Sequence, residues 1–230
     1  MTATPIAVAW SGGKDSTLAL AALRADPRWS IVALVTTVTR GVDRISMHGV
    51  RRVLLERQAD ALRLPLEIAW LEVPSSNADY EAAWAEALRR VQQRVPATRH
   101  IAYGDLFLED VRAYRDAQCA TLGWTPVYPL WGEATDALAR RFVADGHAAI
   151  LTCVDTAQLD AAFAGRDLDD ALLDALPESC DPCGERGEYH TFVWRSSTFA
   201  HAIPVHTGER VRRDERFEYV DLLPDSPPAP

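Results

Sequence analysis

Residues 11–16, Ser11-Gly12-Gly13-Lys14-Asp15-Ser16, combine the residue types that can bind a chain of phosphates. The two glycines let the backbone turn tightly and approach a ligand, so that successive N–H groups can form an anion-binding nest. Ser11 and Ser16 can add hydroxyl donors, and Lys14 can add a positive charge. The alternative is a glycine-rich turn before a helix, with Asp15 or Ser16 capping the first backbone amides.

This segment differs from a Walker A loop at two positions. Val8 stands where that pattern has its first glycine, and Asp15 stands where it has Ser or Thr after the lysine. A carboxylate beside phosphates repels them unless a cation lies between. Asp15 is therefore predicted to hold Mg²⁺, which bridges the phosphate oxygens of a nucleotide.

Strands and helices are predicted to alternate around this segment. Short apolar runs indicate strands at 6–10, 31–38, 66–71 and 101–103, and helix-forming stretches cover 15–23, 50–64, 80–95 and 109–122. Such alternation predicts an α/β fold, a parallel sheet with helices on both faces. Ligands of these sheets bind beyond the carboxyl ends of the strands. Ser11, Thr36 and the pair Gly104-Asp105 are expected to meet there, with the adenine of a nucleotide beside residues 35–37.

The chain changes character after residue 130, where a domain boundary is predicted. Residues 1–130 would form the nucleotide-binding domain and residues 131–223 a smaller substrate-binding domain. In the second part, helices are expected at 134–145 and 168–176, strands at 149–154 and 192–194, and a closing hairpin or edge strands at 199–205 and 216–220. The proline-rich residues 224–230 are predicted to be a disordered tail.

A second candidate group lies in residues 180–190. Cys180 and Cys183 have the spacing of a zinc-ligand pair, but a structural zinc site needs four ligands and only His190 is near. No bound zinc is therefore expected. Cys183 is interpreted as a small residue at a tight turn.

Two carboxylates in the same group are better candidates for chemistry. Gly184 and Gly187 allow a folded loop that could aim Glu185 and Glu188 in the same direction. Paired carboxylates beside a phosphate site can hold ammonium, deprotonate an amine or bind Mg²⁺. A solvated acidic loop is the alternative.

Several segments together carry a family resemblance. Residues 11–16 resemble the PP-loop of the N-type ATP pyrophosphatases. Within that group, Met47-His48-Gly49-Val50, Tyr103-Gly104-Asp105 and residues 181–192 are similar to the diphthine–ammonia ligase family and its uncharacterised prokaryotic relatives. The resemblance runs from about Ile6 to about Val193. It implies a HUP-type, Rossmann-like nucleotide-binding domain followed by a smaller C-terminal α+β domain.

The resemblance also implies an activity: an ATP-dependent ligase that adenylates a carboxylate with release of pyrophosphate. Ammonia or another amine then displaces AMP. Lys14, Asp15, Glu185 and Glu188 become the expected catalytic residues. The nucleotide would contact residues 11–16, Thr36, His48, Gly104 and Asp105, and the substrate would contact Cys183, Gly184, Glu185, Glu188 and His190. His48 is equally well explained as a capping or surface histidine.

Other functions remain open at this point. A hydrolase would attack the α-phosphate with water, and a non-catalytic nucleotide sensor would need neither Glu185 nor Glu188. A tRNA sulfur or nitrogen transferase is disfavoured, because the chain lacks a paired-cysteine relay. Its net charge of −9, from 24 Lys and Arg against 33 Asp and Glu, also disfavours nucleic acid as a partner. Diphthine is the acceptor in the similar ligases, but a small molecule or another protein carboxylate is an equal alternative, and a homo-oligomer remains open.

The rest of the sequence bears on location. It contains no apolar run long enough to span a bilayer and no N-terminal signal peptide pattern, and its four cysteines are too few and scattered for a disulfide framework. A cytoplasmic enzyme is expected.

Overall fold

A computed structural model describes residues 2–45 and 49–225 of the 230-residue chain. The chain divides into two compact units. The first comprises Met1–Ser11, Asp15–Ser46 and Arg63–Gly132, and the second comprises Gly12–Lys14, Met47–Leu62 and Glu133–Pro230. This division is not a single cut along the sequence, because a short loop and one helix from the N-terminal half group with the C-terminal half. The linear boundary near residue 130 stays a prediction.

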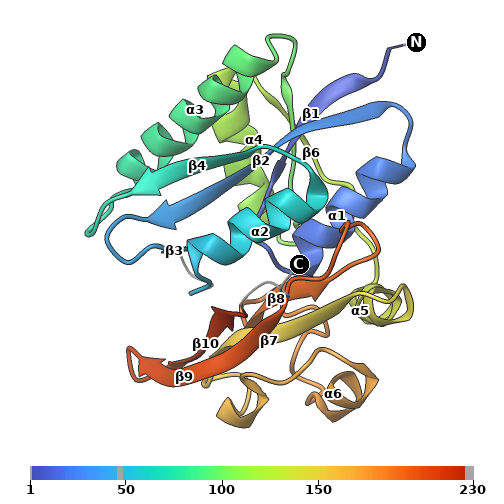
Figure 1. Cartoon of the computed structure of the whole chain (residues 1–230), viewed down its shortest axis with the longest axis vertical. Helices are drawn as coiled ribbons and strands as arrows, with labels where there is room; N and C mark the ends of the chain where they lie inside the picture. Colours follow the sequence, from blue (N-terminus) through green and yellow to red (C-terminus); the bar gives the residue numbers. More distant parts are fainter. Residues whose placement is uncertain (1, 46–48, 226–230) are drawn as a thin grey trace. The chain divides into compact units, whose positions relative to one another are not determined.

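The first unit is built on a six-stranded sheet (Figure 1). Its order is β3-β2-β1-β5-β6, with β4 paired to β2, and every pair is parallel except β2 with β3. The strands are β1 (Thr4–Ala9), β2 (Trp29–Thr39), β3 (Arg44–Ile45), β4 (Leu66–Leu71), β5 (His100–Ala102) and β6 (Thr125–Val127). Strand β1 is central, and Ile6, Ala7 and Val8 are fully buried, as an apolar run predicts for a parallel strand.

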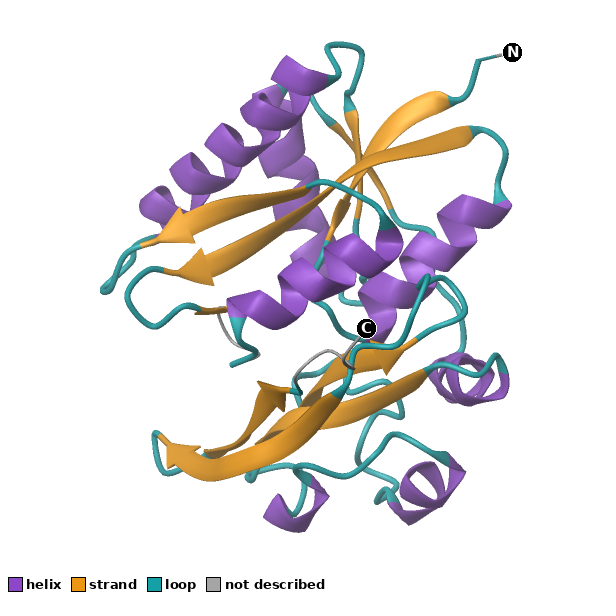
Figure 2. Ribbon diagram, viewed as in Figure 1, coloured by secondary structure: helices purple, strands orange, loops and turns teal. Residues whose placement is uncertain are grey.

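Helices cover this sheet on both faces, as Figure 2 shows for α3 and α4 on one side and α1 on the other. They are α1 (Lys14–Ala25), α3 (Asn77–Arg94) and α4 (Glu109–Leu122). Helix α3 begins with a capping box between Ser76 and Asp79, and α4 ends at Gly123 with φ of 69°. Trp84 and Leu88 of α3 and Cys119 of α4 pack with Val35 of β2 in one buried core.

The second unit contains a four-stranded antiparallel sheet of order β8-β7-β10-β9. The strands are β7 (Ala148–Asp155), β8 (Tyr189–Arg195), β9 (Val205–Arg213) and β10 (Phe217–Pro224). Its helices are α2 (Arg52–Leu62), α5 (Thr135–Ala144), the 3₁₀ turn η1 (Ala161–Phe163) and α6 (Asp170–Ala175). The two units together confirm the predicted α/β class, a Rossmann-like sheet with helices and a smaller C-terminal sheet domain.

Most predicted elements agree with the structure within a few residues, with a few exceptions. The hairpin strand expected at 199–205 is wrong, because β9 begins only at Val205 and pairs with β10 up to Arg213. Alternation of apolar residues before Val205 misled the prediction. Strands β3 and β6 were not predicted. Pro224, assigned to a disordered tail, ends β10 opposite Val205, and residues 226–230 lie outside the described residues.

Membrane spans were also sought among the helices. Among the described residues, no helix has both the length and the apolar character needed to cross a membrane.

Candidate functional site

Three predicted nucleotide contacts lie at one edge of the parallel sheet in the first unit. Strand register pairs Ala9 with Val35 and Val8 with Ala102, and the Trp10 N–H donates to the Val35 carbonyl over 2.7 Å. Ser11 and Gly104 follow the carboxyl ends of β1 and β5, as expected. Thr36 is level with the end of β1 but lies inside β2, which continues to Thr39.

The polar groups at this edge also contact one another. Ser11 Oγ lies 3.2 Å from Ser16 Oγ, so the two hydroxyls predicted to bind phosphate form a pair across the turn. A Cβ at Gly104 would lie 2.9 Å from the Asp15 carbonyl carbon and 3.1 Å from the Ser16 nitrogen. Packing therefore explains why position 104 is a glycine, because the backbone after β5 approaches the start of α1 too closely for any side chain.

Asp105, another predicted nucleotide contact, forms an ion pair. The Arg115 guanidinium donates to its carboxylate from Nε over 2.6 Å and from Nη2 over 3.3 Å. The same guanidinium lies 4.4 Å from the centre of the Tyr103 ring. The carboxylate of Asp105 thus holds a half-buried arginine in place at this edge of the sheet.

The phosphate loop is the segment of residues 11–16. Its middle, residues 12–14, runs beside strand β8, and both belong to the second unit. The Gly12 carbonyl accepts from the Val193 N–H and from Gln58 Nε2, each over 2.9 Å, and Gln58 Nε2 also donates to the Val193 carbonyl over 2.8 Å. The Lys14 N–H donates to Thr191 Oγ1 over 3.1 Å. Strand β8 is the outer strand of its sheet, and residues 12–14 bond to its outer edge.

Glycine is required at the first position of this contact. Gly12 has φ of +78°, and a Cβ there would lie 2.7 Å from both Gln58 Oε1 and Leu55 Cδ2. Gln58 and Thr191 were not identified from the sequence. One signal for Gln58 existed: it lies four residues after Leu54 and four before Leu62, on the apolar face of its helix, where a buried amide needs partners.

The side chain of Lys14 is buried, with 2% of its surface exposed. Its Nζ donates to the Cys183 carbonyl and lies 5.6 Å from the centre of the Tyr189 ring. The second unit thus brings together two motifs separated by about 170 residues: the lysine of the phosphate loop, and the glycine-rich segment of residues 180–191.

The glycine-rich segment, residues 180–191, is folded by its own carboxylates. Asp181 Oδ1 accepts from the N–H groups of Cys183 and Glu185 over 3.0 and 3.2 Å. Glu188 has 1% of its surface exposed, and its two oxygens accept from the N–H groups of Asp181 and Arg186 over 2.8 and 2.9 Å. Sequence reasoning expected the Glu188 carboxylate to point the same way as that of Glu185, but it bonds inside the loop. Asp181 was missed altogether.

A tyrosine and a glycine close this loop. The Tyr189 hydroxyl donates to the Pro182 carbonyl over 2.5 Å. Gly184 has φ of +66°, and a Cβ there would lie 2.9 Å from the Tyr189 carbonyl oxygen. Gly187 has φ of +84° with open space around it. Both glycines are needed for the turn, and Gly184 also for a close contact.

Burial changes the acid–base properties of two groups in the segment. It lowers the pKa of His190 to about 4, helped by the charge of Lys14, so the imidazole is neutral near pH 7. Burial, with the charges of Glu188 and Asp181, raises the pKa of the Cys180 thiol to about 12. A protonated thiol is a poor metal ligand.

The thiols of the segment also have partners within it or beside it. Cys183 Sγ donates to the Thr135 carbonyl over 3.2 Å. In residues 2–45 and 49–225, no group of three or more His, Cys, Asp or Glu side chains is arranged to hold a metal ion. His48, the remaining predicted contact, lies outside the described residues.

Comparison with known protein families decides the classification. Residues 4–126 match the model for the diphthamide synthase N-terminal domain, and residues 134–221 match that for its C-terminal domain. The chain belongs to the diphthamide synthase family. No curated protein matches the chain. A diphthamide synthase of this kind is a PP-loop enzyme that uses ATP, which confirms the resemblance carried by residues 11–16 and 181–192.

Proposed function

We propose that the protein is an ATP-dependent amide-forming ligase. A carboxylate of the acceptor attacks the α-phosphate of ATP, the bond to the β-phosphate breaks, and pyrophosphate leaves. Ammonia or another amine then attacks the acyl-adenylate, and AMP leaves with the amide product formed. Membership of the diphthamide synthase family supports ATP as the nucleotide, and the contact between Lys14 and the glycine-rich segment supports coupling of the two half-reactions.

The phosphate loop would act by position and charge. The backbone N–H groups of the loop would bind phosphate oxygens, and the buried Lys14 ammonium would supply positive charge where negative charge develops. Mg²⁺ would neutralise phosphate charge, with Asp15 supplying one carboxylate ligand. Ser11, Ser16 and Thr36 would contact the nucleotide from the same edge of the sheet.

The glycine-rich segment would serve the second half-reaction. Glu188 and Asp181 hold backbone N–H groups of the loop, so we assign them positioning roles. Glu185 is the carboxylate proposed to accept a proton from the amine. His190, neutral near pH 7, would contact the substrate without adding charge.

The observation that carries this proposal is the hydrogen bond from Lys14 to the Cys183 carbonyl. Phosphate oxygens would compete for the same ammonium. Nucleotide binding would therefore release the carbonyl and alter the loop that holds Glu185. A hydrolase needs no such link between a phosphate-binding lysine and a second carboxylate loop, although it remains the alternative.

The test separates the two half-reactions. Purified protein is incubated with ATP, Mg²⁺ and ammonium chloride, with and without unfractionated cell extract as the source of the acceptor, and AMP with pyrophosphate should form. Exchange of labelled pyrophosphate into ATP reports adenylation alone. Glu185→Gln should retain this exchange better than amide formation, whereas the exposed control Glu178→Gln should retain both.

Two outcomes would contradict the proposal. Formation of ADP and phosphate would show that another bond is cleaved. Formation of AMP at the same rate without acceptor or amine would identify a hydrolase.

A further inference from the structure

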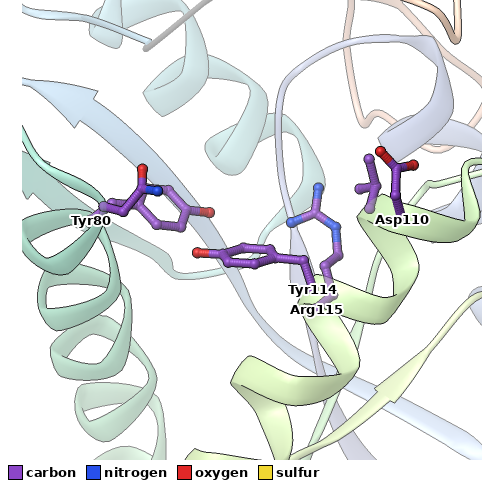
Figure 3. A pocket seen from close by; sticks show the side chains of 6 residues that line it. Tyr80, Asp110, Tyr114 and Arg115 are labelled. Carbon is purple, nitrogen blue, oxygen red and sulfur yellow. The ribbon is translucent and has the colours of Figure 1, made fainter.

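A pocket of about 440 Å³ opens between the first turns of α3 and α4, in the first unit (Figure 3). It is lined by six residues from these two helices: Asn77, Tyr80, Asp110, Val111, Tyr114 and Arg115. None of them belongs to the site residues predicted from the sequence. The volume is within the range of small-molecule sites and is large enough for one or two fused rings with a short side chain.

Aromatic rings approach the pocket from both helices. Tyr80 of α3 and Tyr114 of α4 point toward each other in Figure 3. Tyr80 is backed by the ring of Trp84, whose centre lies 6.1 Å away and nearly parallel. Tyr114 keeps 41% of its surface exposed, and its hydroxyl donates to Glu81 over 3.2 Å. The two phenol rings in the lining give the pocket apolar ring surface on which a flat ring can stack.

The charges around the pocket disfavour a bare anion. Arg115 is its cation, but the carboxylate of Asp105 pairs with that guanidinium over 2.6 Å. Asp110 adds a negative charge from the rim. Burial raises the pKa of Tyr80, an effect that the charge and a hydrogen bond of Arg115 oppose, so the two groups lie close together. The lining therefore offers ring faces with hydrogen-bonding groups at the edge, and little net positive charge.

The pocket is linked to the phosphate loop through one short segment. Arg115 pairs with Asp105, and Asp105 follows Gly104 directly. Gly104 in turn packs against the backbone of Asp15 and Ser16 so closely that a Cβ would lie 2.9 Å from the former. A ligand in the pocket is thus separated from the end of the phosphate loop by little more than one ion pair and a glycine.

We propose that this pocket binds a planar aromatic or heteroaromatic ring of the acceptor, whose carboxylate the enzyme adenylates. The ring lies between Tyr80 and Tyr114, with its polar edge toward Arg115 and Asn77. This deepens the proposed function and rests on it for the identity of the acceptor. Binding of the non-reacting ring holds the carboxylate in position for attack on the α-phosphate.

The test uses indole-3-acetate as a planar acid and octahydroindene-1-acetate as a saturated acid with the same fused five- and six-membered rings, with binding followed by saturation-transfer NMR on the full chain. The planar acid should bind and the saturated acid should bind at least about tenfold more weakly. Tyr114→Ala should raise the Kd for indole-3-acetate about tenfold, as loss of one stacking partner worth about 1.4 kcal/mol predicts. Tyr114→Phe should restore binding, because the ring face remains.

Two controls make the result specific. Val211→Ala removes a side chain of similar exposure, 38%, from the second unit and should leave binding unchanged. AMP should not displace indole-3-acetate. Because Tyr114 is exposed, the alanine variant should also keep the melting temperature of the original protein.

Three results would overturn the inference: equal binding of the planar and saturated acids, unchanged binding in Tyr114→Ala, or displacement by AMP, which would make this the adenine site. These results are independent of turnover. If indole-3-acetate binds as expected and no AMP forms from ATP with any acceptor, then the proposed function fails while the ring site stands.

Discussion

Replacement of Gln58 by Met tests whether one buried amide fixes the phosphate loop. Gln58 is fully buried, and its Nε2 donates to the carbonyls of Gly12 and Val193 over 2.9 and 2.8 Å. Methionine has a similar length and volume but cannot donate, so the change removes both hydrogen bonds while largely preserving the packing.

The cost can be worked out from the two acceptors. Gly12 keeps its bond from the Val193 N–H, so the larger loss falls on the Val193 carbonyl. Each lost bond contributes about 1 kcal/mol, and a buried acceptor left without a partner adds to this, giving about 2 to 3 kcal/mol in total. For a chain of this length, that corresponds to a fall in melting temperature of roughly 5 to 10 °C.

A second glutamine provides the control. Gln118 of α4 has 9% of its surface exposed, and neither its Nε2 nor its Oε1 has a hydrogen-bond partner in the described part of the chain. Gln118→Met should therefore leave the stability unchanged or increase it, because two buried unpaired polar atoms are removed. Differential scanning calorimetry of the two variants gives the comparison.

Nucleotide binding supplies the second measurement. Gln58→Met should also weaken ATP binding in isothermal titration, because the carbonyl of Gly12 loses one of the bonds that orient the loop. Gln118→Met should not affect it. Equal melting shifts in both variants, or a large shift in Gln58→Met with unaltered ATP binding, would refute the reasoning.

Further predictions concern the phosphate loop and the glycine-rich segment. Gly184→Ala should destabilise the protein more than Gly187→Ala in urea unfolding. Both substitutions place alanine at a left-handed residue, which costs about 1 kcal/mol, but only the first also creates a clash. Equal losses of unfolding free energy in the two variants would contradict this. The free energy of unfolding should fall as pH drops from 6.5 to 4, since His190 binds a proton more readily when unfolded, and His190→Gln should flatten this part of the profile. Lys14→Ala should reduce turnover more than adenosine binding, and it should raise the pKa of His190 in NMR titration because the charge of Lys14 lowers that pKa. Asp15→Asn should raise the Mg²⁺ concentration needed for activity, because one carboxylate ligand is lost. An unchanged Mg²⁺ requirement would show that Asp15 is only a helix cap.

The sequence alone determined the class of fold and indicated which strand ends lie along one edge of the sheet. Apolar strands that alternate with helix-forming stretches allow few arrangements other than a parallel sheet, and parallel strands place their carboxyl ends along one edge. For that reason Ser11 and Gly104 could be brought together from spacing alone, and they follow the ends of the paired strands β1 and β5, whereas Thr36 lies inside the longer β2. The phosphate loop and the glycine-rich segment likewise sufficed to indicate the family.

The sequence could not show what each polar side chain bonds to. Glu185 and Glu188 look equivalent in the string, yet Glu188 is fully buried and accepts two backbone N–H groups of its own loop. Asp105 stays a predicted nucleotide contact, and the sequence did not show that Arg115, ten residues later on α4, pairs with its carboxylate. A hydrogen bond requires two groups within about 3 Å, and local patterns do not determine which groups meet.

Only the tertiary structure placed residues 12–14 beside strand β8 and within one compact unit with residues 133–230. Sequence periodicity reports which side of an element is buried, because that side repeats every two or 3.6 residues. The partner across such a contact leaves no comparable repeat. Gln58, Thr191 and the pocket between α3 and α4 therefore emerged only once the chain was folded, because each depends on groups that lie far apart in the sequence.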